Sequence, residues 1–343
     1  MRLKQLGEFA LIEKIRKATS SGHGVYLGIG DDAAWTRAKG NLLLTSDLLI
    51  DKVHFDLRWA TYFGLGYKTL AVNLSDLAAM GGTPQYLVLS LGLPVDFKVK
   101  DIEEFYRGIR QLASQSGVSL VGGDTCASKC FFTSAFLVGY APYGPVKRSG
   151  AKVGDDLYVT GTLGDSFLGL DLLKKRKQKS SNEEVAYLTS RHLFPQARLK
   201  AGSILAKERI AKAMIDISDG LVQDLGHLCK ASGTGAEIWQ EAIPLSPSYR
   251  RLAGVHRIRY SLSGGEDYEL LFSVRARDRK RLQKIRNRLA VPITHIGKCV
   301  PASRGITVAT SQGTALSLAQ MGHDHFKGRP LRKALLSSRS TKA

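Results

Sequence analysis

The feature that most restricts the fold of this chain is a series of aspartates in short motifs rich in glycine and serine. They occur in Gly28-Ile-Gly-Asp-Asp32, Thr45-Ser-Asp47, Asn73-Leu-Ser-Asp76, Gly122-Gly-Asp-Thr125 and Asp216-Ile-Ser-Asp-Gly220. Carboxylates repel one another, so they gather in a cleft only where a divalent cation neutralises them. Mg²⁺ bound by a few carboxylates and by substrate phosphates is the commonest such arrangement. The motifs therefore indicate a fold that brings these acids together for phosphate chemistry.

The composition indicates a folded, intracellular protein. A length of 343 residues with 43% hydrophobic residues is enough for two globular domains. Four cysteines without a CxxC pair are too few for a disulfide framework and do not suggest zinc, so we expect reduced thiols. The N-terminus lacks the apolar region of a signal peptide, and no apolar run is long enough to span a bilayer. We expect a cytoplasmic protein with no membrane partner.

The formal net charge of +20 is concentrated in residues 174–177, 275–288 and 327–343. None of these stretches is interleaved with aromatic residues, and no nucleic-acid-binding motif accompanies them. We therefore predict solvated helix faces and a disordered basic tail over 327–343, with no nucleic-acid partner. Attraction of polyanionic nucleotides is a modest secondary use of the charge.

Strand-like and helix-like patterns alternate along the chain, which predicts an α/β or α+β fold. In the first half we expect strands at 25–27, 42–45, 86–93, 118–121 and 131–140, and helices at 64–80 and from an Asp101 cap to Gly117. In the second half we expect strands at 156–160, 213–217, 267–274, 293–296 and 306–308, and helices at 165–173, 195–207 and 221–232, with a basic helix before residue 293. Pro195 is expected in the first turn of its helix. The Pro- and Gly-rich connector at 141–145 divides the chain into domains 1–145 and 146–326, followed by the tail 327–343.

The first motif resembles a dinucleotide-binding fingerprint, but its context argues against that function. Too few residues separate its glycines from the next strand for a crossover helix, and two aspartates would face the pyrophosphate. A metal ligand at Asp32 is the better interpretation, with a plain turn as the alternative. Thr45, Ser46 and Asp47 offer three hard oxygen donors at a strand end, although a simple turn there would look the same. His54 could contact a substrate or pack in the core.

The remaining motifs give stronger signals. Asp76 lies on a helix of small and apolar residues, where an unpaired charge is costly. Asp124 follows a predicted strand and is expected at its carboxyl edge, where α/β proteins bind ligands. Asp216 and Asp219 repeat this arrangement in the second half, with Ser218 as a predicted N-cap. The P-loop, the protein-kinase motifs and the nucleophile elbow are all absent.

Five segments occur together in the order of a known family. They are Gly7-Glu-Phe-Ala-Leu-Ile12, Asn73-Leu-Ser-Asp-Leu-Ala-Ala-Met-Gly81, Arg148-Ser-Gly-Ala151, Ser263-Gly-Gly-Glu-Asp-Tyr-Glu269 and Gly322-His-Asp-His-Phe326. On these residues the chain resembles the thiamine-monophosphate kinase family, which belongs to the aminoimidazole ribonucleotide synthetase-like superfamily. The resemblance implies a two-domain α/β (α+β) fold. Its N-terminal domain pairs with its copy in a homodimer, and ATP binds between that domain and a C-terminal α/β domain.

The resemblance also implies the roles of individual residues. The Mg²⁺ ligands would be Asp32, Thr45, Ser46, Asp47, Asp76, Asp124, Asp216 and Asp219. ATP would contact Gly123, Asp124, Arg148 and Ser218, thiamine monophosphate would contact His54, Glu266 and His323, and Asp47, Asp76 and Arg148 would be catalytic. The chain departs from the family at Cys126-Ala-Ser-Lys-Cys130, where Thr-Arg-Gly is usual, and at His323, where an aromatic residue is usual.

The activity implied is in-line transfer of the γ-phosphoryl group of ATP to thiamine monophosphate, assisted by several Mg²⁺ ions. The acceptor phosphate has a second pKa near 6 and is largely ionised at neutral pH, so no dedicated base is needed. Two alternatives stay open. A cyclising or activating relative would phosphorylate an amide or selenide, and a nucleotide-binding module without catalysis would keep the glycines but lose carboxylates.

Overall fold

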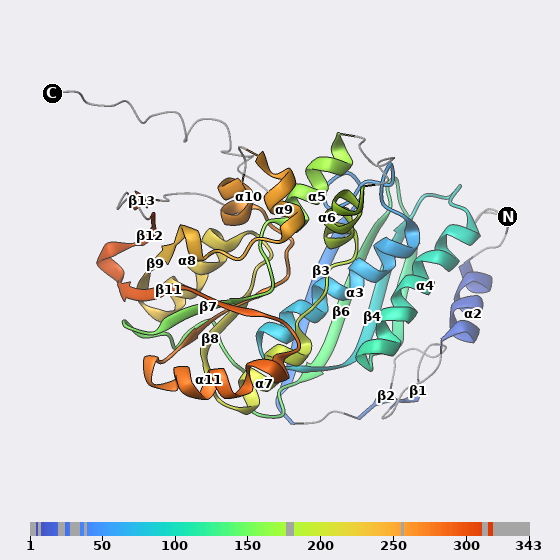
Figure 1. Ribbon diagram of the computed structural model, residues 1–343. Coiled ribbons are helices and arrows are strands. Elements are labelled where there is room, and N and C mark those ends of the chain that lie inside the picture. Colours follow the sequence, from blue (N-terminus) through green and yellow to red (C-terminus); the bar gives the residue numbers. More distant parts are fainter. Residues whose placement is uncertain are drawn as a thin grey trace.

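The structure is a computed structural model that describes residue 5 and residues 8–19, 25–27, 35–37, 40–175, 182–254, 257–310 and 315–317. Its described part contains two larger sheets, each with its own helices (Figure 1). The first sheet has the order β3-β6-β4-β5, with β4 and β5 parallel and the other neighbours antiparallel. Its strands are β3 (Leu42–Ile50), β4 (Thr83–Leu93), β5 (Ser119–Ala127) and β6 (Phe132–Tyr140). A separate two-stranded ribbon joins β1 (Val25–Leu27) and β2 (Trp35–Thr36).

Two helices cover one face of the first sheet, α3 (Tyr62–Ala79) and α4 (Val99–Ser116), and α2 (Glu8–Ala18) lies beside α4 (Figure 1). The Thr61 side chain caps α3 by accepting a hydrogen bond from the Gly64 N–H. The two helices cross closely at two glycines. A Cβ at Gly66 would lie 1.9 Å from the Phe105 carbonyl oxygen, and one at Gly108 would lie 1.9 Å from that of Phe63. Larger residues would force the helices apart.

The second sheet has seven strands in the order β13-β12-β9-β11-β7-β10-β8. They are β7 (Asp156–Thr160), β8 (Ala211–Asp216), β9 (Thr234–Trp239), β10 (Leu270–Val274), β11 (Ile293–Pro301), β12 (Ile306–Ala309) and β13 (Ala315–Ser317). The helices of this half are α5 (Asp165–Lys174), α6 (Glu183–Leu193), α7 (Leu199–Lys207), α8 (Leu221–Ser232), α9 (Pro247–Leu252), α10 (Arg257–Ser263) and α11 (Arg279–Ile285).

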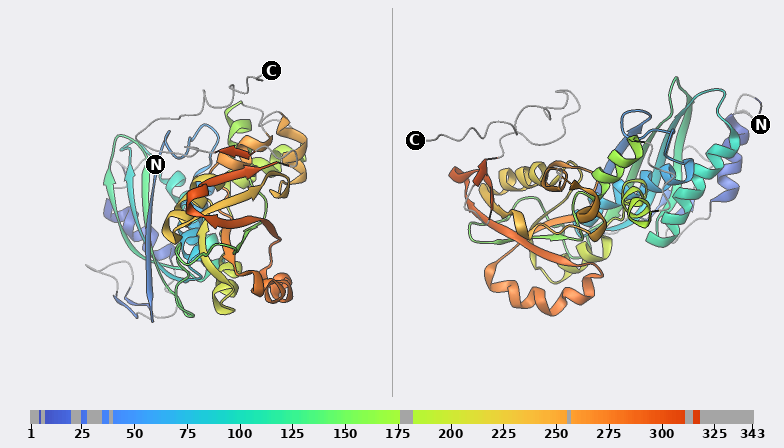
Figure 2. Two further views of the ribbon diagram at one scale, coloured as in Figure 1. Left: turned by 90° about the vertical axis from the view of Figure 1, so that its left-hand side faces the viewer. Right: turned by 45° about the horizontal axis from the view of Figure 1, so that its top comes forward.

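Helix α3 joins the two halves. It contacts α7 and β8, and its residues Ala78 and Ala79 belong to a buried cluster that includes Leu205 and Phe272 of the second half. A Cβ at Gly202 of α7 would lie 2.0 Å from the Ala78 carbonyl oxygen, so the two helices meet backbone to backbone. Figure 2 shows the halves as two lobes that meet there. Side chains on this part of α3 therefore face the junction of the two lobes.

Several predicted boundaries are wrong, and local context explains them. Helix α4 begins at Val99 with Lys98 as its N-cap, so Asp101 lies in the first turn and is not the cap. Helix α7 begins at Leu199, which leaves Pro195 outside it. Strand β5 continues through Gly122–Thr125 to Ala127, and the strand expected from residue 267 begins at Leu270 because residues 264–269 form an irregular loop. Helices α2, α6, α9 and α10 and strands β2, β9 and β13 were not predicted.

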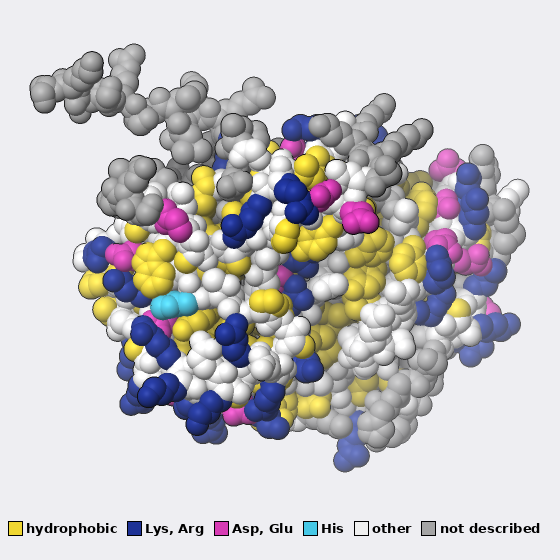
Figure 3. Space-filling view, in the orientation of Figure 1, with side chains coloured by type: hydrophobic (Ala, Val, Ile, Leu, Met, Phe, Trp, Pro, Cys, Tyr) yellow, Lys and Arg dark blue, Asp and Glu magenta, His cyan; other side chains and the backbone are white. Residues whose placement is uncertain are grey.

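The basic stretch after β10 forms the expected amphipathic helix. Leu282 and Ile285 of α11 are buried, while its basic side chains lie outside, and Figure 3 shows Lys and Arg gathered over this helix at the lower left. Among the described residues, no helix has the length and apolar character needed to cross a membrane. The predicted tail 327–343 lies outside the described residues.

Candidate active site

Three aspartates from three elements converge where the lobes meet. Asp47 lies on β3, Asp76 on α3 and Asp216 at the end of β8. Burial, followed by the charges of Asp76 and Asp216, raises the pKa of Asp47 to about 7. Burial also raises the pKa of Asp76, and burial together with the charge of Asp76 raises that of Asp216. The site therefore holds negative charge that the protein alone compensates poorly.

Neighbouring hydroxyl groups and one arginine stabilise these acids in part. The Thr45 hydroxyl donates to Asp76 Oδ2, and the Ser75 hydroxyl donates to Asp216 Oδ2 at 2.7 Å across the lobe junction. The positive charge of Arg148, in the connector between the lobes, offsets part of the rise in the pKa of both Asp76 and Asp216. Arg148 is itself exposed, so its guanidinium is accessible from solvent beside the acids.

The loop after β8 is organised by an aspartate that the sequence did not indicate. Asp224 Oδ2 accepts the backbone N–H groups of Ser218, Asp219 and Gly220, each at 3.1 Å. Gly220 precedes α8, so the predicted N-cap at Ser218 is wrong. Asp219, Asp224 and His227 offer ligand atoms within 4.8 Å of one another. Gln223 donates a hydrogen bond to Asp219 Oδ2, so part of this group already has a partner within the protein.

A second group of charged residues surrounds the loop at 264–269. Glu266 Oε1 lies 2.8 Å from Lys68 Nζ, and Glu266 Oε2 lies 3.2 Å from His192 Nδ1. His54 lies near Glu266, and its Nδ1 accepts the Ile50 N–H at 3.1 Å. The structure thus brings together two of the predicted substrate residues, His54 and Glu266.

The backbone of this loop is strained at two positions. Glu266 has a φ of 69° and Tyr268 a φ of 52°, although neither is glycine. Such residues are held in the left-handed region only where the surroundings determine them, and they cluster at functional sites. The phenol of Tyr268 is buried, and burial followed by the charges of Glu266 and Asp47 raises its pKa well above the ordinary value. It therefore stays protonated, and it lies near acids of both groups.

The remaining predicted residues of the first lobe do not join this cluster within one chain. Strands β3 and β5 are the two edges of their sheet, about 14 Å apart at the usual strand spacing. The register pairs Asp124 with Ser90, Ser90 with Ser134 and Ser134 with Leu48, so these four residues form one row across the sheet. Residues of one row point to the same face, so Asp124 shares the face of exposed Leu48, whereas Asp47 points to the opposite face.

Ser46 also points away from the cluster, because it alternates with the inward-facing Thr45 and Asp47 and is exposed. Gly123 lies on β5 with a φ of 155°, and a Cβ there would lie 1.8 Å from the Leu89 carbonyl oxygen. Asp32 and His323 lie outside the described residues.

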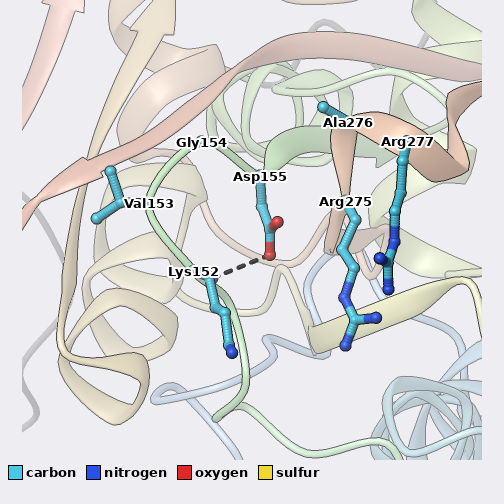
Figure 4. A pocket seen from close by; sticks show the side chains of 7 residues that line it. All are labelled: Lys152, Val153, Gly154, Asp155, Arg275, Ala276 and Arg277. Carbon is cyan, nitrogen blue, oxygen red and sulfur yellow. Dashed lines mark hydrogen bonds between the residues drawn. The ribbon is translucent and has the colours of Figure 1, made fainter.

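The pocket in Figure 4, with a volume of about 490 Å³, lies elsewhere. It is formed by residues before β7 and after β10, about 14 Å along β10 from the end that pairs with Asp216. Its side chains Lys152, Arg275 and Arg277 extend toward the same side, and its one carboxylate, Asp155, accepts the Lys152 N–H at 2.9 Å. This pocket lacks the carboxylate cluster and is not the predicted site.

Sequence reasoning missed residues that act through the predicted ones. Lys68, His192, Ser75, Asp224 and Tyr268 all contact or surround predicted acids, yet none was selected. Two of them had a local signal, since Tyr268 lies between acids in the Ser263–Glu269 motif and Ser75 lies in the Asn73–Asp76 motif. The others are a lysine, an aspartate and a histidine on helices, which are common on any folded chain.

The donor set fits magnesium. Oxygen donors from Asp47, Asp76 and Asp216 converge with the Thr45 and Ser75 hydroxyls, and hard oxygen ligands of this kind suit Mg²⁺. Burial and, after it, the charges of Asp76 and Asp216 raise the pKa of Asp47, and a bound divalent cation would relieve the repulsion among these acids. No histidine or cysteine takes part in this cluster among the residues described, which disfavours softer metals.

Comparison with known proteins agrees with this geometry. The model for the N-terminal domain of AIR synthase related proteins matches residues 30–141, and the model for their C-terminal domain matches residues 152–309. The chain is 42% identical over 327 residues to the thiamine-monophosphate kinase of Salmonella typhimurium, covering 93% of this chain and 98% of that protein.

Solved structures give the same result. The crystal structure of thiamine-monophosphate kinase from Stenotrophomonas maltophilia aligns with a TM-score of 0.80 and 36% identity, over 90% of this chain and 98% of that one. A structure described as AaThiL complexed with AMPPCP and TMP aligns with a TM-score of 0.72 and 35% identity, over 94% of this chain and 99% of that one. The predicted two-domain α/β fold is confirmed.

Proposed function

The chain belongs to the thiamine-monophosphate kinase family of AIR synthase related proteins, and from that premise we propose that it phosphorylates thiamine monophosphate with ATP. The products are thiamine diphosphate and ADP. The observation that carries the proposal is the convergence of Asp47, Asp76 and Asp216 at the junction of the lobes, beside the Glu266 loop. A phosphoryl-transfer site needs this concentration of oxygen donors to hold two polyanions together.

Each predicted residue then has a role in in-line transfer. Asp47, Asp76, Asp216 and Asp219 would hold several Mg²⁺ ions together with Thr45, and Asp32, Ser46 and Asp124 would complete the ligand set that the family resemblance implies. Bound Mg²⁺ would neutralise phosphate charge. Arg148, always charged, holds a phosphate oxygen of ATP during transfer. Gly123, Asp124 and Ser218 contact ATP, and His54, Glu266 and His323 contact thiamine monophosphate.

We also propose that the protein is a homodimer formed through the open face of the first sheet. Leu44, Leu48 and Phe136 on that face are 61%, 46% and 39% exposed, although they lie on central positions of β3 and β6. A contiguous apolar surface of this kind supports an interface. Asp124 shares a row with Leu48, so pairing through this face would place it at the interface. Leu44→Arg should shift the protein from dimer to monomer in gel filtration, and an unchanged elution volume would contradict the dimer.

The domain limits remain as proposed from sequence, 1–145 and 146–326, and we place the enzyme in the cytoplasm, where ATP is abundant. The test of function is a substrate assay. Purified protein with MgATP and thiamine monophosphate should yield ADP and thiamine diphosphate in equal amounts, and EDTA should stop the reaction. Asp76→Asn is the matched variant and should lose most of the activity.

The alternatives predict different results in the same assay. Formylglycinamidine ribonucleotide or selenide would drive ADP formation in a cyclising or activating relative. A nucleotide-binding module would retain ATP without consuming it. If thiamine monophosphate leaves ATP intact while another acceptor consumes it, the family assignment stands and the proposed activity is wrong.

A further inference from the structure

The group formed by Lys68, Glu266 and His192 spans the two lobes and is unevenly buried. The side chains of Lys68 and His192 are 5% and 3% exposed, whereas that of Glu266 is 27% exposed. Lys68 comes from α3 of the first lobe and His192 from α6 of the second. Both carboxylate oxygens of Glu266 therefore have a buried partner, while part of the Glu266 side chain is open to solvent.

The other acids of the same loop have purely internal partners. Asp267 accepts the Gly164 N–H at 2.6 Å and the Ser166 N–H at 3.1 Å, and Glu269 is bound by Arg191 and Arg198. These contacts fix the loop directly after Glu266, and the Glu266 N–H donates to the Ser218 carbonyl at 2.8 Å, which together explain how its φ of 69° persists. Glu266 is thus the one acid of this loop that is both rigidly held and partly open to solvent.

The charges of the group favour an ionised carboxylate. Burial raises the pKa of Glu266, but interactions led by the charge of Lys68 and its hydrogen bond outweigh burial and leave the pKa lowered. Burial, followed by the charge of Lys68, lowers the pKa of His192 to about 3, so the imidazole is neutral, with Nδ1 in contact with both Glu266 Oε2 and the Ser166 hydroxyl. Lys68 supplies the positive charge that keeps Glu266 ionised, and removing it would leave a carboxylate that is poorly compensated.

We propose that Lys68 is a positioning residue that holds the Glu266 carboxylate toward the cationic thiazolium ring of thiamine monophosphate, with His192 as the second support. This inference rests on the proposed function. A carboxylate attracts the ring cation and repels the phosphate, so it orients the acceptor with its phosphate away from Glu266. Lys68 would then set the affinity for the acceptor without touching it.

The experiment compares Lys68→Met, which keeps the length of the side chain and removes its charge, with Lys68→Arg and with the control Lys175→Met. Lys175 forms an exposed ion pair with Asp171 at 2.7 Å, so its loss tests the effect of removing a surface lysine. Lys68→Met should raise the KM for thiamine monophosphate by about tenfold, a usual size for coupling between contacting residues. The KM for ATP and kcat should change less than about threefold. Lys68→Arg should restore part of the affinity, and Lys175→Met should resemble the wild type.

Two further measurements separate positioning from a general structural effect. Calorimetric titration with thiamine monophosphate alone should show the same loss of affinity. The double variant Lys68→Met/Glu266→Gln should bind no more weakly than Glu266→Gln, because Lys68 acts through that carboxylate. If Lys68→Met does not fold, His192→Gln replaces it and should raise the same KM by about threefold.

If the wild type is active and the folded Lys68→Met variant has the same KM for thiamine monophosphate, this inference alone is wrong. Equal losses in the KM for both substrates, or additive effects in the double variant, also overturn it. A wild type that leaves thiamine monophosphate unphosphorylated overturns the proposed function together with this inference.

Discussion

Replacing Asp47 with asparagine should stabilise the metal-free protein while abolishing its activity. The pKa of this carboxyl is raised from 3.8 to about 7 by burial and by the charges of Asp76 and Asp216. A raised folded-state pKa means that ionisation costs nothing below pH 3.8, costs progressively more up to pH 7 and costs a constant amount above it. At pH 8 the full cost is about 4 kcal/mol at 1.36 kcal/mol per pH unit. Because Asp47 is partly exposed, solvent screening reduces this to about 2 to 4 kcal/mol.

The asparagine amide has the same shape, carries no charge and can donate hydrogen bonds to neighbouring carboxylates. Asp47→Asn should therefore raise the melting temperature in EDTA at pH 8 by several degrees, at about 2 to 4 °C per kcal/mol for a domain of this size. The gain should shrink as the pH falls from 7 toward 5, because the wild-type carboxyl then becomes protonated. Activity with MgATP should fall at least about a hundredfold, since a neutral amide cannot offset the charge of Mg²⁺.

The matched control is Asp124→Asn, which removes another proposed metal ligand at an exposed position. It should lose activity without a gain in stability, because Asp124 lies apart from the three clustered aspartates. Thermal unfolding by circular dichroism at pH 5, 6.5 and 8, with EDTA or Mg²⁺, measures both variants. An Asp47→Asn protein that is less stable than the wild type in EDTA at pH 8, or a gain that does not change with pH, would refute the reasoning.

Three more outcomes follow from the same structure. Added Mg²⁺ should raise the wild-type melting temperature more at pH 8 than at pH 5.5, because protons compete for Asp47, and an equal shift at both would contradict this. His192, with a pKa lowered to about 3, should cost the wild type about 2 kcal/mol of stability as the pH falls from 7 to 5. His192→Gln should therefore flatten the curve of unfolding free energy against pH in this range. A curve parallel to that of the wild type would count against a neutral imidazole. In denaturant titrations, the free energy of unfolding of Glu266→Gly should exceed that of Glu266→Ala by about 1 kcal/mol, since glycine accepts the φ of 69° freely. The reverse order would exclude strain at this position.

The parts of the fold that were predictable from sequence are those specified by local patterns. Leu70, Leu74 and Leu77 recur at helical spacing, and α3 contains them with all three buried. The turn after it was also predictable, because Gly81 has a φ of 68° that suits glycine. The motif acids Asp47, Asp76 and Asp216 were found for a similar reason, since charged residues in small or apolar surroundings stand out in a sequence.

The parts that could not be predicted depend on contacts between distant residues. The Lys68–Glu266 pair joins positions far apart in the chain, and nothing near Lys68 distinguishes it from a surface lysine. The N-cap of α4 was misplaced because Asp101 is a strong local cap signal, yet the helix starts one turn earlier, at Val99. Asp124 was expected at a strand end because its glycines suggested a turn, but pairing with β4 extends the strand through them.

Helix α3 explains why one site can recognise a molecule that is cationic at one end and anionic at the other. Lys68, Ser75 and Asp76 are seven and eight residues apart, so they lie along one stripe of the helix about 11 Å long. At one end Lys68 holds Glu266, and at the other Ser75 holds Asp216 beside Asp76. Both contacts reach residues of the second lobe, so the separation between the two charged groups is set by the rise of a rigid helix. Any change in the docking of the lobes must alter both contacts together, which ties the recognition of the acceptor ring to the geometry of the phosphate site.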